Sequence, residues 1–185
     1  MPGFELVGEE ERKAVNELFD DGGVLFAHGF DNIRNNRYHV REFEEEFAKC
    51  LGVKYAQAVS SGTAALKIAL LALGVKPGDE VITQAFTFIA TAEAIIDIGA
   101  KPIFINIDET LNMDPNELES AISDKTTAII PVHMLGVATE QDKILIIARK
   151  YGIPVLDDAC ESLGAEWGNE KLGVQCDISA WSFDA

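Results

Sequence analysis

From residue 54 onwards, apolar strand-like runs alternate with helix-like runs, and this alternation constrains the fold more than any other feature of the sequence. The clearest strand-like runs are "EVITQ", "KPIFINI", "TTAIIPV" and "IPVLDD", and a run of seven residues, "DISAWSF", follows later. Strands that alternate with helices across short turns form βαβ units, in which helices cover both faces of a parallel sheet. The pattern therefore predicts an α/β fold with a mainly parallel sheet flanked by helices.

Two local features of this region give sharper expectations. The run "YAQAVSS" precedes the helix-like "TAALKIALLAL", so we expect the first strand of the sheet there. In "DPNELESAI", Asp114 suits an N-cap, Pro115 suits the first helical position, and Glu117 is placed to complete a capping box.

The first 53 residues have a different character. "EEERKAVNELFD" and "VREFEEEFAKCLG" have the pattern of surface helices, and an irregular stretch joins them. We therefore expect residues 1–53 to form an N-terminal helical arm and residues 54–185 to form the sheet domain.

Composition excludes several classes of function. A net charge of −16 argues against binding to nucleic-acid phosphates. The start "MPGFELVGEEER" has no apolar core of a signal peptide, and no apolar run is long enough to span a membrane, so we expect a cytoplasmic protein. No metal site is expected, because the cysteines and histidines have no ligand spacing: Cys50, Cys160, Cys176, His28, His39 and His133.

Ligands of open parallel sheets bind beyond the carboxyl ends of the strands. Ser61, Gly62 and Thr63 lie where the first strand passes into a helix, and free helix amides there could hold a phosphate. Phe86 and Phe88 follow the next strand, where a ring could stack on a planar ligand. Taken singly, a helix cap explains the first group better than a phosphate site does, and ordinary core packing explains the two phenylalanines better than ligand stacking does.

The ends of two further strands complete this set of candidate residues. Asp157 and Asp158 end an apolar strand, and their side chains should point to opposite sides of it. One carboxylate can face the crevice, where it would suit a protonated ring nitrogen, although either could instead cap a helix. Ser182 ends the last strand near the same crevice. A phosphate cradle, a ring stacker, an anion and a serine together are the groups that bind pyridoxal 5′-phosphate (PLP).

The chain resembles the DegT/DnrJ/EryC1/StrS family of PLP-dependent sugar aminotransferases, which have the aspartate aminotransferase type I fold. The matching segments run in order from Tyr55 to Phe183, among them "SSGTAALKIAL", "GDEVITQAFTFIATAEAI", "VLDDACESLGA" and "DISAWSF". The resemblance implies a PLP-binding large domain that residues 54–185 contain only in part.

The resemblance also implies roles for individual residues. Ser61, Gly62 and Thr63 would hold the cofactor phosphate with Ser182, Phe88 would stack on the pyridine ring, and Asp158 would keep the ring nitrogen protonated. Glu161 stands where the family carries Gln or His against the phenolic oxygen of the ring. A carboxylate there should repel a phenolate unless the two share a proton.

The lysine that forms the Schiff base in this family would fall just after Ala185, so the catalytic residue is unknown here. We expect the chain to be the front part of a longer enzyme that also has the last strand of the sheet and a small domain. Relatives that carry His in place of this lysine are sugar dehydratases, and a third alternative is an inactive PLP-binding fragment.

The N-terminal segments "MPGFELVGEEE" and "FAHGFDNIRNNRYHVREFE" are similar to the subgroup that makes 8-amino-3,8-dideoxy-D-manno-octulosonate, an amino sugar acid of lipopolysaccharide. This resemblance implies L-glutamate as amino donor, an aldehyde or keto sugar as acceptor, and a homodimer with its active site at the interface. Arg34 and Arg37 could bind a substrate carboxylate, but they could equally pair with nearby glutamates. Nucleotide-linked 3- or 4-ketosugars are the alternative substrates.

Overall fold

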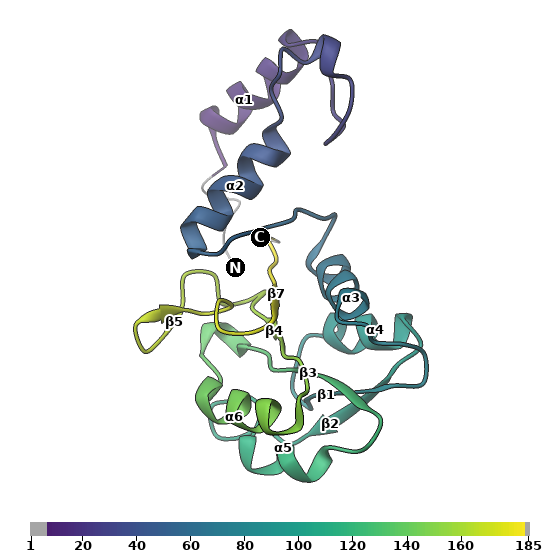
Figure 1. Cartoon of the computed structure of the whole chain (residues 1–185). Helices are drawn as coiled ribbons and strands as arrows, with labels where there is room; N and C mark the ends of the chain where they lie inside the picture. Colours follow the sequence, from purple (N-terminus) through teal and green to yellow (C-terminus); the bar gives the residue numbers. More distant parts are fainter. Residues whose placement is uncertain (1–6, 184–185) are drawn as a thin grey trace. The chain divides into compact units, whose positions relative to one another are not determined.

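The computed structural model describes residues 7–183, which form two compact units, 7–58 and 59–183 (Figure 1). The N-terminal unit contains helix α1 (Glu9–Asp20), the short 3-10 helix η2 (Asp31–Ile33) and helix α2 (His39–Leu51). All the remaining elements belong to the second unit, which we call the sheet unit. The expected boundary after residue 53, and the assignment of residues 54–185 to a partial cofactor-binding domain, stay predictions.

The sheet unit is built on parallel strands, as the alternation predicted. Strand β1 (Glu80–Gln84) pairs with β2 (Lys101–Ile105) on one side and with β3 (Thr126–Ile130) on the other. Strand β4 (Leu156–Asp158) pairs with β7 (Ile178–Ala180), also in parallel. Parallel bridges from Ile129 to Val155 and from Val132 to Asp158 place β4 beside β3. The carboxyl ends of these strands therefore meet at one edge.

Helices cover both faces of this sheet. One face packs on α3 (Gly62–Ala72) and α4 (Ile89–Asp97), and the other packs on α5 (Pro115–Ala121) and α6 (Gln141–Tyr151). Strand β3 shows the division: Ala128 and Ile130 are buried with α3 and α4, whereas Ile129 is buried with α5 and α6. Because neighbouring residues of a strand point to opposite faces, two adjacent polar residues at its end reach two different environments.

Short elements complete the sheet unit. The 3-10 helix η3 (Met134–Gly136) follows β3, and β5 (Glu166–Trp167) pairs with β6 (Glu170–Lys171) in an antiparallel hairpin. No helix among residues 7–183 is long and apolar enough to cross a bilayer.

Two expectations about local structure are wrong. Residues 55–61 contain no strand, and Tyr55 is 76% exposed. An extended segment becomes a strand only when a neighbour satisfies its backbone, and no described residue pairs with this one.

The capping box at α5 also fails. Asp114 caps the helix by accepting the amide of Asn116 at 2.9 Å, as expected. The carboxylate of Glu117, however, accepts the backbone amide of Asn106 at 3.1 Å and its side-chain amide at 2.7 Å. A capping box would need the amide of Asp114 to donate to Glu117. That amide instead donates to the carbonyl of Asn106 at 3.1 Å, which brings Asn106 to the start of the helix.

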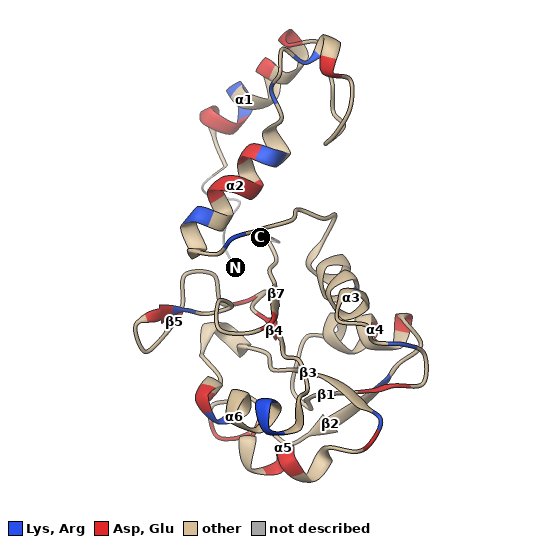
Figure 2. Cartoon of the chain, viewed as in Figure 1, with Lys and Arg blue, Asp and Glu red and all other residues tan. Residues whose placement is uncertain are grey.

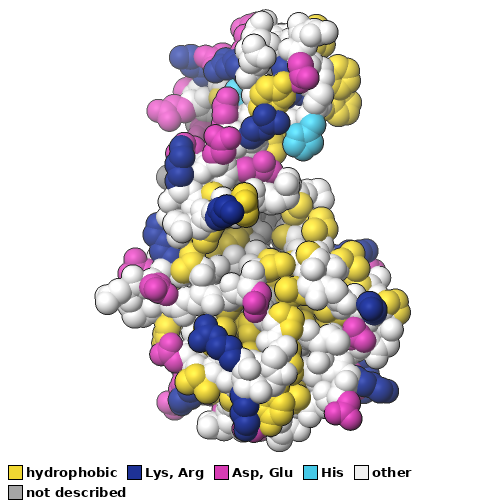
Figure 3. Space-filling view, in the orientation of Figure 1, with side chains coloured by type: hydrophobic (Ala, Val, Ile, Leu, Met, Phe, Trp, Pro, Cys, Tyr) yellow, Lys and Arg dark blue, Asp and Glu magenta, His cyan; other side chains and the backbone are white. Residues whose placement is uncertain are grey.

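Both signs of charge are distributed over each unit. Acidic residues predominate on α1 and α2 (Figure 2), and the face shown in Figure 3 has basic and acidic side chains interspersed.

Candidate functional site

Three segments of the sheet unit meet at the carboxyl edge of the strands. They are the N-terminus of α3, the turn after β4, and the residues after β7. Gly62 marks the meeting point, because a Cβ atom built on it would lie 3.0 Å from Cβ of Ser182 and 3.2 Å from Sγ of Cys160. Only glycine lets the start of α3 approach Ser182 and Cys160 this closely.

The first turn of α3 offers donors at this place. Ser61 is the N-cap, and its Oγ accepts the amide of Ala64 at 3.1 Å. Gly62 and Thr63 are the first helical residues, whose amides have no acceptor within the helix. These amides and the helix dipole favour an anion such as a phosphate. Ser61 itself serves as a cap, which is the simpler of the two roles weighed from the sequence.

Asp158 lies at the end of β4 on the face that packs against α3 and α4. Its Oδ2 accepts the hydroxyl of Thr91 at 2.8 Å, and its Oδ1 accepts the amide of Cys160 at 3.3 Å. The residue is 3% exposed, and burial raises the pKa of Asp158 above its ordinary value despite these hydrogen bonds. Within residues 7–183, no lysine or arginine forms an ion pair with it.

A buried carboxylate without a cation is costly, and a cationic ligand would remove that cost. The protonated nitrogen of a pyridine ring has the required charge and a single N–H to donate. Asp158 therefore fits the site for which the sequence proposed it.

Phe88 and Thr91 link α4 to the same edge. Phe88 is the N-cap of α4 and is 65% exposed, so ordinary core packing does not explain it. Thr91 lies one turn later on the same side of the helix and donates to Asp158. Thr87 Oγ1 lies 2.8 Å from Thr91 Oγ1.

Asp157, the neighbour of Asp158, is enclosed on the opposite face. Its carboxylate accepts the side-chain amide of Gln141 at 2.8 Å and the backbone amide of Gly173 at 3.1 Å. His133 contacts it through Nε2 at 3.1 Å, while Nδ1 accepts the amide of Thr139, so the ring proton sits on Nε2. His133 and Asp157 are both fully buried. This network is structural.

Glu161 is occupied by the backbone. Its Oε2 accepts the amide of Leu135 at 2.8 Å, and Leu135 has a left-handed φ of 55°. Glu161 thus holds the η3 turn close to the segment that follows β4. A glutamine could accept the same bond, so this contact does not require the negative charge.

Cys160 stays a neutral thiol. Burial, followed by the nearby charge of Asp158, raises its pKa far above the ordinary value. Its Sγ lies 3.8 Å from the carbonyl of Ala180 and beside Gly62, so it forms part of the cradle wall.

Arg34 and Arg37 lie in the N-terminal unit. Arg37 pairs with Asp21 at 2.6 Å, and Arg34 donates to the carbonyl of Phe26 at 2.7 Å. Neither pairs with the glutamates that the sequence suggested as their partners.

The structure thus brings together most of the residues that the sequence singled out in the sheet unit. Gly62, Asp158 and Ser182 share one edge with the start of α3, and Phe88 is joined to it through Thr91. The sequence analysis missed Thr91 and Cys160 as members of this site. The spacing of three residues between Phe88 and Thr91 was the available signal. Within the described part of the chain, no three His, Cys, Asp or Glu side chains cluster as metal ligands.

Comparisons with known proteins identify the family of the chain. The sequence profile of the DegT/DnrJ/EryC1/StrS aminotransferase family matches residues 10–185. The UDP-2-acetamido-2-deoxy-3-oxo-D-glucuronate aminotransferase of Pseudomonas aeruginosa is 45% identical over 152 residues, which are 80% of this chain and 42% of that protein.

Solved structures show the same fold. An aminotransferase from Psychrobacter cryohalolentis superposes with a TM-score of 0.86 and 35% identity, over 96% of this chain and 43% of that one. NtdA from Bacillus subtilis, solved with bound cofactor PMP, gives a TM-score of 0.80 and 35% identity over 94% of this chain and 38% of that one. The chain therefore spans less than half the length of these relatives.

Proposed function

Because the chain belongs to the DegT/DnrJ/EryC1/StrS aminotransferase family, we propose that the whole protein is a PLP-dependent aminotransferase that transfers an amino group to a sugar carbonyl. The observation that carries the proposal is the buried carboxylate of Asp158, which forms no ion pair with a lysine or arginine among residues 7–183. It lies at the edge where the start of α3 closely approaches Ser182 at Gly62. A phosphorylated pyridine ring supplies both missing groups, a cation and an anion.

Each group at this edge has one role toward the cofactor. The amides of Gly62 and Thr63, together with Ser182, bind the phosphate at the N-terminus of α3. Asp158 holds the proton on the ring nitrogen, and Thr91 orients that carboxylate. Phe88 covers one face of the ring and excludes water from it. When bound, PLP supplies an electron sink for the negative charge that develops at the carbon losing a proton.

Glu161 is proposed to contribute indirectly. Its hydrogen bond to Leu135 holds the η3 turn. A carboxylate beside the phenolic oxygen of the ring would repel it unless the two share a proton. The proton donor and acceptor for the substrate is expected to be a lysine of the whole protein.

The amino donor that we propose is L-glutamate, and the acceptor is an aldehyde or keto sugar. A nucleotide-linked 3-ketosugar is favoured by the P. aeruginosa relative, whose name specifies a substrate of this type. The octulosonate of lipopolysaccharide remains a candidate on the resemblance of the N-terminal segments. Both substrates carry a carboxylate. We also propose a cytoplasmic homodimer with the active site at its interface.

The test uses the purified full-length protein with PLP. L-glutamate should convert the cofactor, bleach its visible absorbance band and release 2-oxoglutarate, and a keto sugar should restore the band. Release of 2-oxoglutarate without transfer of the amino group to any sugar would contradict the proposed class of acceptor. Loss of a sugar hydroxyl without use of glutamate would instead identify a dehydratase. Binding of PLP without conversion by either substrate would identify an inactive PLP-binding protein.

A further inference from the structure

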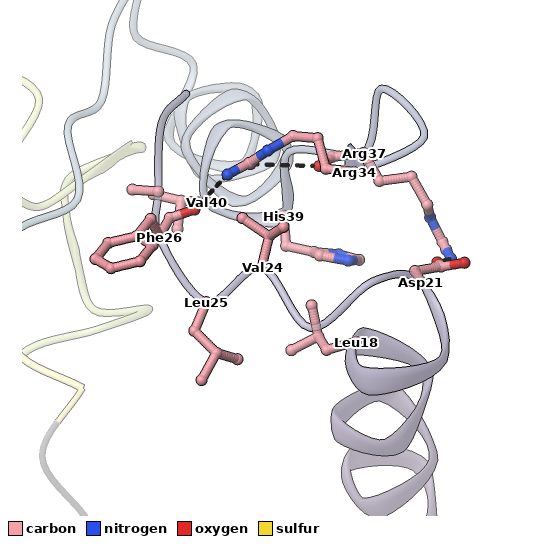
Figure 4. Close-up of a pocket in the computed structure, with 10 residues that line it drawn as sticks. Leu18, Asp21, Val24, Leu25, Phe26, Arg34, Arg37, His39 and Val40 are labelled. Atoms are coloured by element: carbon pink, nitrogen blue, oxygen red, sulfur yellow. Dashed lines mark hydrogen bonds and ion pairs between the residues drawn. The ribbon is translucent and has the colours of Figure 1, made fainter. Parts of the chain in front are cut away.

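The N-terminal unit contains a pocket of its own, far from the sheet in sequence. Its volume is about 130 Å³, and residues from the end of α1, the following loop and the start of α2 line it. Figure 4 shows Arg34 reaching the backbone at Phe26, while Arg37 and Asp21 meet on another side of the pocket. Most of the other walls are apolar, formed by Leu18, Val24, Leu25, Ala27 and Val40.

Arg34 is the unusual residue in this pocket. It is 6% exposed, so its guanidinium is nearly removed from water. One nitrogen donates to the carbonyl of Phe26 at 2.7 Å, and a second reaches the carbonyl of Arg37 only at 3.5 Å. The third nitrogen, Nε, is buried and has no hydrogen-bond partner. The guanidinium also lies 4.6 Å from the ring centre of Tyr38.

The acidic side chains around this pocket have other partners. Asp21 pairs with Arg37 at 2.6 Å, Asp31 accepts the hydroxyl of Tyr38, and Glu42 lies 3.5 Å from the His39 ring. Within residues 7–183, no carboxylate therefore neutralises Arg34. A buried cation served only by carbonyls and a ring has an incompletely compensated desolvation cost.

We propose that this pocket binds the carboxylate of a small organic acid, with Arg34 as its anchor. A carboxylate supplies the missing negative charge, and its two oxygens match the donors of a guanidinium. The apolar walls suit the carbon skeleton that a carboxylate carries, whereas a bare phosphate would leave them in contact with water. The volume is below the roughly 300–1,000 Å³ of pockets that enclose drug-sized ligands, so the pocket fits a small acid or one end of a longer one.

This site goes beyond the proposed amino transfer, because its contacts involve no residue of the sheet unit. Arg37 differs from Arg34 in the same pocket: its ion pair with Asp21 already neutralises it, and its pKa is raised by that partner. The geometry thus separates two arginines that the sequence treated alike.

The experiment measures binding of D-glucuronate to the PLP-loaded full-length protein by calorimetry. D-glucose, which has a neutral CH₂OH in place of the carboxylate, and inorganic phosphate are tested beside it. Arg34→Gln removes the anchor. Arg41→Gln is the matched control, since Arg41 also lies over the Tyr38 ring, at 4.7 Å, but does not line the pocket.

We expect wild type and R41Q to bind glucuronate with affinities within about twofold, and R34Q to bind at least about tenfold more weakly. Glucose and phosphate should not compete. Equal binding by R34Q and R41Q would overturn the proposal, and so would Arg34-dependent binding of phosphate as strong as that of glucuronate.

A second variant covers the case in which R34Q does not fold. Val24→Phe keeps Arg34 and fills the pocket from its wall, so glucuronate binding should be lost by a similar factor. Unchanged glucuronate binding by V24F would contradict the proposed location of the site in this pocket. Conversion of the cofactor by L-glutamate is measured separately on the same samples, so a failure of this site and a failure of the amino transfer remain distinguishable.

Discussion

Asp157 and Asp158 are adjacent, fully or almost fully buried, and opposite in their surroundings. Asp157 is enclosed by donors from Gln141, Gly173 and His133, all within hydrogen-bonding distance. Asp158 has two donors, Thr91 and Cys160, and burial raises its pKa.

The difference shows how one strand end can serve stability and chemistry together. The side chain that points toward α6 is satisfied by the protein itself and ties β4 to the loops around it. The side chain that points toward α3 and α4 has no lysine or arginine paired with it among the described residues, and it lies at the edge where α3 begins. A buried carboxylate of this second kind marks a place for a cationic ligand.

The largest expected effect comes from Asp158→Asn. Without the carboxylate, the ring nitrogen loses the ion pair that keeps its proton, so the rate of amino transfer should fall by about 100-fold or more. The measurement is single-turnover conversion of the cofactor by L-glutamate. Asp157→Asn is the matched control: its amide nitrogen would face donors from Gln141 and Gly173, which should cost about 1–3 kcal/mol of folding free energy. If the two variants lose activity equally, the division of roles between the two aspartates is wrong.

Gly62→Ala tests the cradle. The added methyl group would lie 3.0 Å from Ser182 and 3.2 Å from Cys160, in the space proposed for the phosphate. The methyl group should displace Ser182 and crowd the phosphate at the start of α3, so the dissociation constant of PLP should rise by about 5- to 150-fold, equivalent to about 1–3 kcal/mol. Equilibrium titration with PLP checks this value. Gly8→Ala serves as control, because its Cβ would meet nothing within 4 Å, and it should leave the affinity unchanged.

Thr91→Val removes a hydrogen bond that lowers the pKa of Asp158. The pKa of Asp158 should therefore rise further, because the charged form of the carboxylate loses a donor. The acid limb of the pH–rate profile should move to higher pH by the same amount. Thr87→Val should move it less, since Thr87 acts on Asp158 only through Thr91. Equal shifts in both variants would mean that Thr91 does not position the carboxylate.

The raised pKa also sets the pH dependence of the cofactor-free protein. Because Asp158 binds its proton more tightly when folded than when unfolded, its contribution to stability is present at low pH. That contribution is lost as pH rises from the ordinary aspartate range through the raised pKa. Urea unfolding across this range should show D158N gaining stability relative to wild type as pH increases. A constant difference between the two would contradict the raised pKa.

Glu161→Gln should give the smallest effect. The side-chain carbonyl of glutamine can still accept the Leu135 amide, so folding should be unchanged. Loss of the negative charge beside the phenolic oxygen should improve PLP affinity by a few-fold, on the scale of about 0.5–1 kcal/mol. Weaker binding in this variant would show that the glutamate shares a proton with the cofactor.

The sequence was a good guide to the sheet because its signals are local. Strand-like runs such as those of β1 and β3 alternate with helix-like runs, so the sequence predicted a mainly parallel sheet flanked by helices. The opposite directions of Asp157 and Asp158 followed from the two-residue repeat of a strand.

Features that depend on neighbours distant in sequence were less accessible. Residues 55–61 have the composition of a strand, but a strand also needs a paired neighbour. Glu117 has the position of a capping residue, but Asn106 arrives beside it from the end of β2. Thr91 joins the site only because α4 packs next to β4. The difference between Arg34 and Arg37 likewise depends on Asp21, which lies on the far side of a loop.

The most direct test of the central claim is the nitrogen-15 NMR signal of the cofactor ring nitrogen in the full-length protein loaded with labelled PLP. The account predicts a protonated nitrogen in wild type and in D157N, and an unprotonated one in D158N at the same pH. An unprotonated nitrogen in wild type, or a protonated one in D158N, would contradict the role assigned to Asp158.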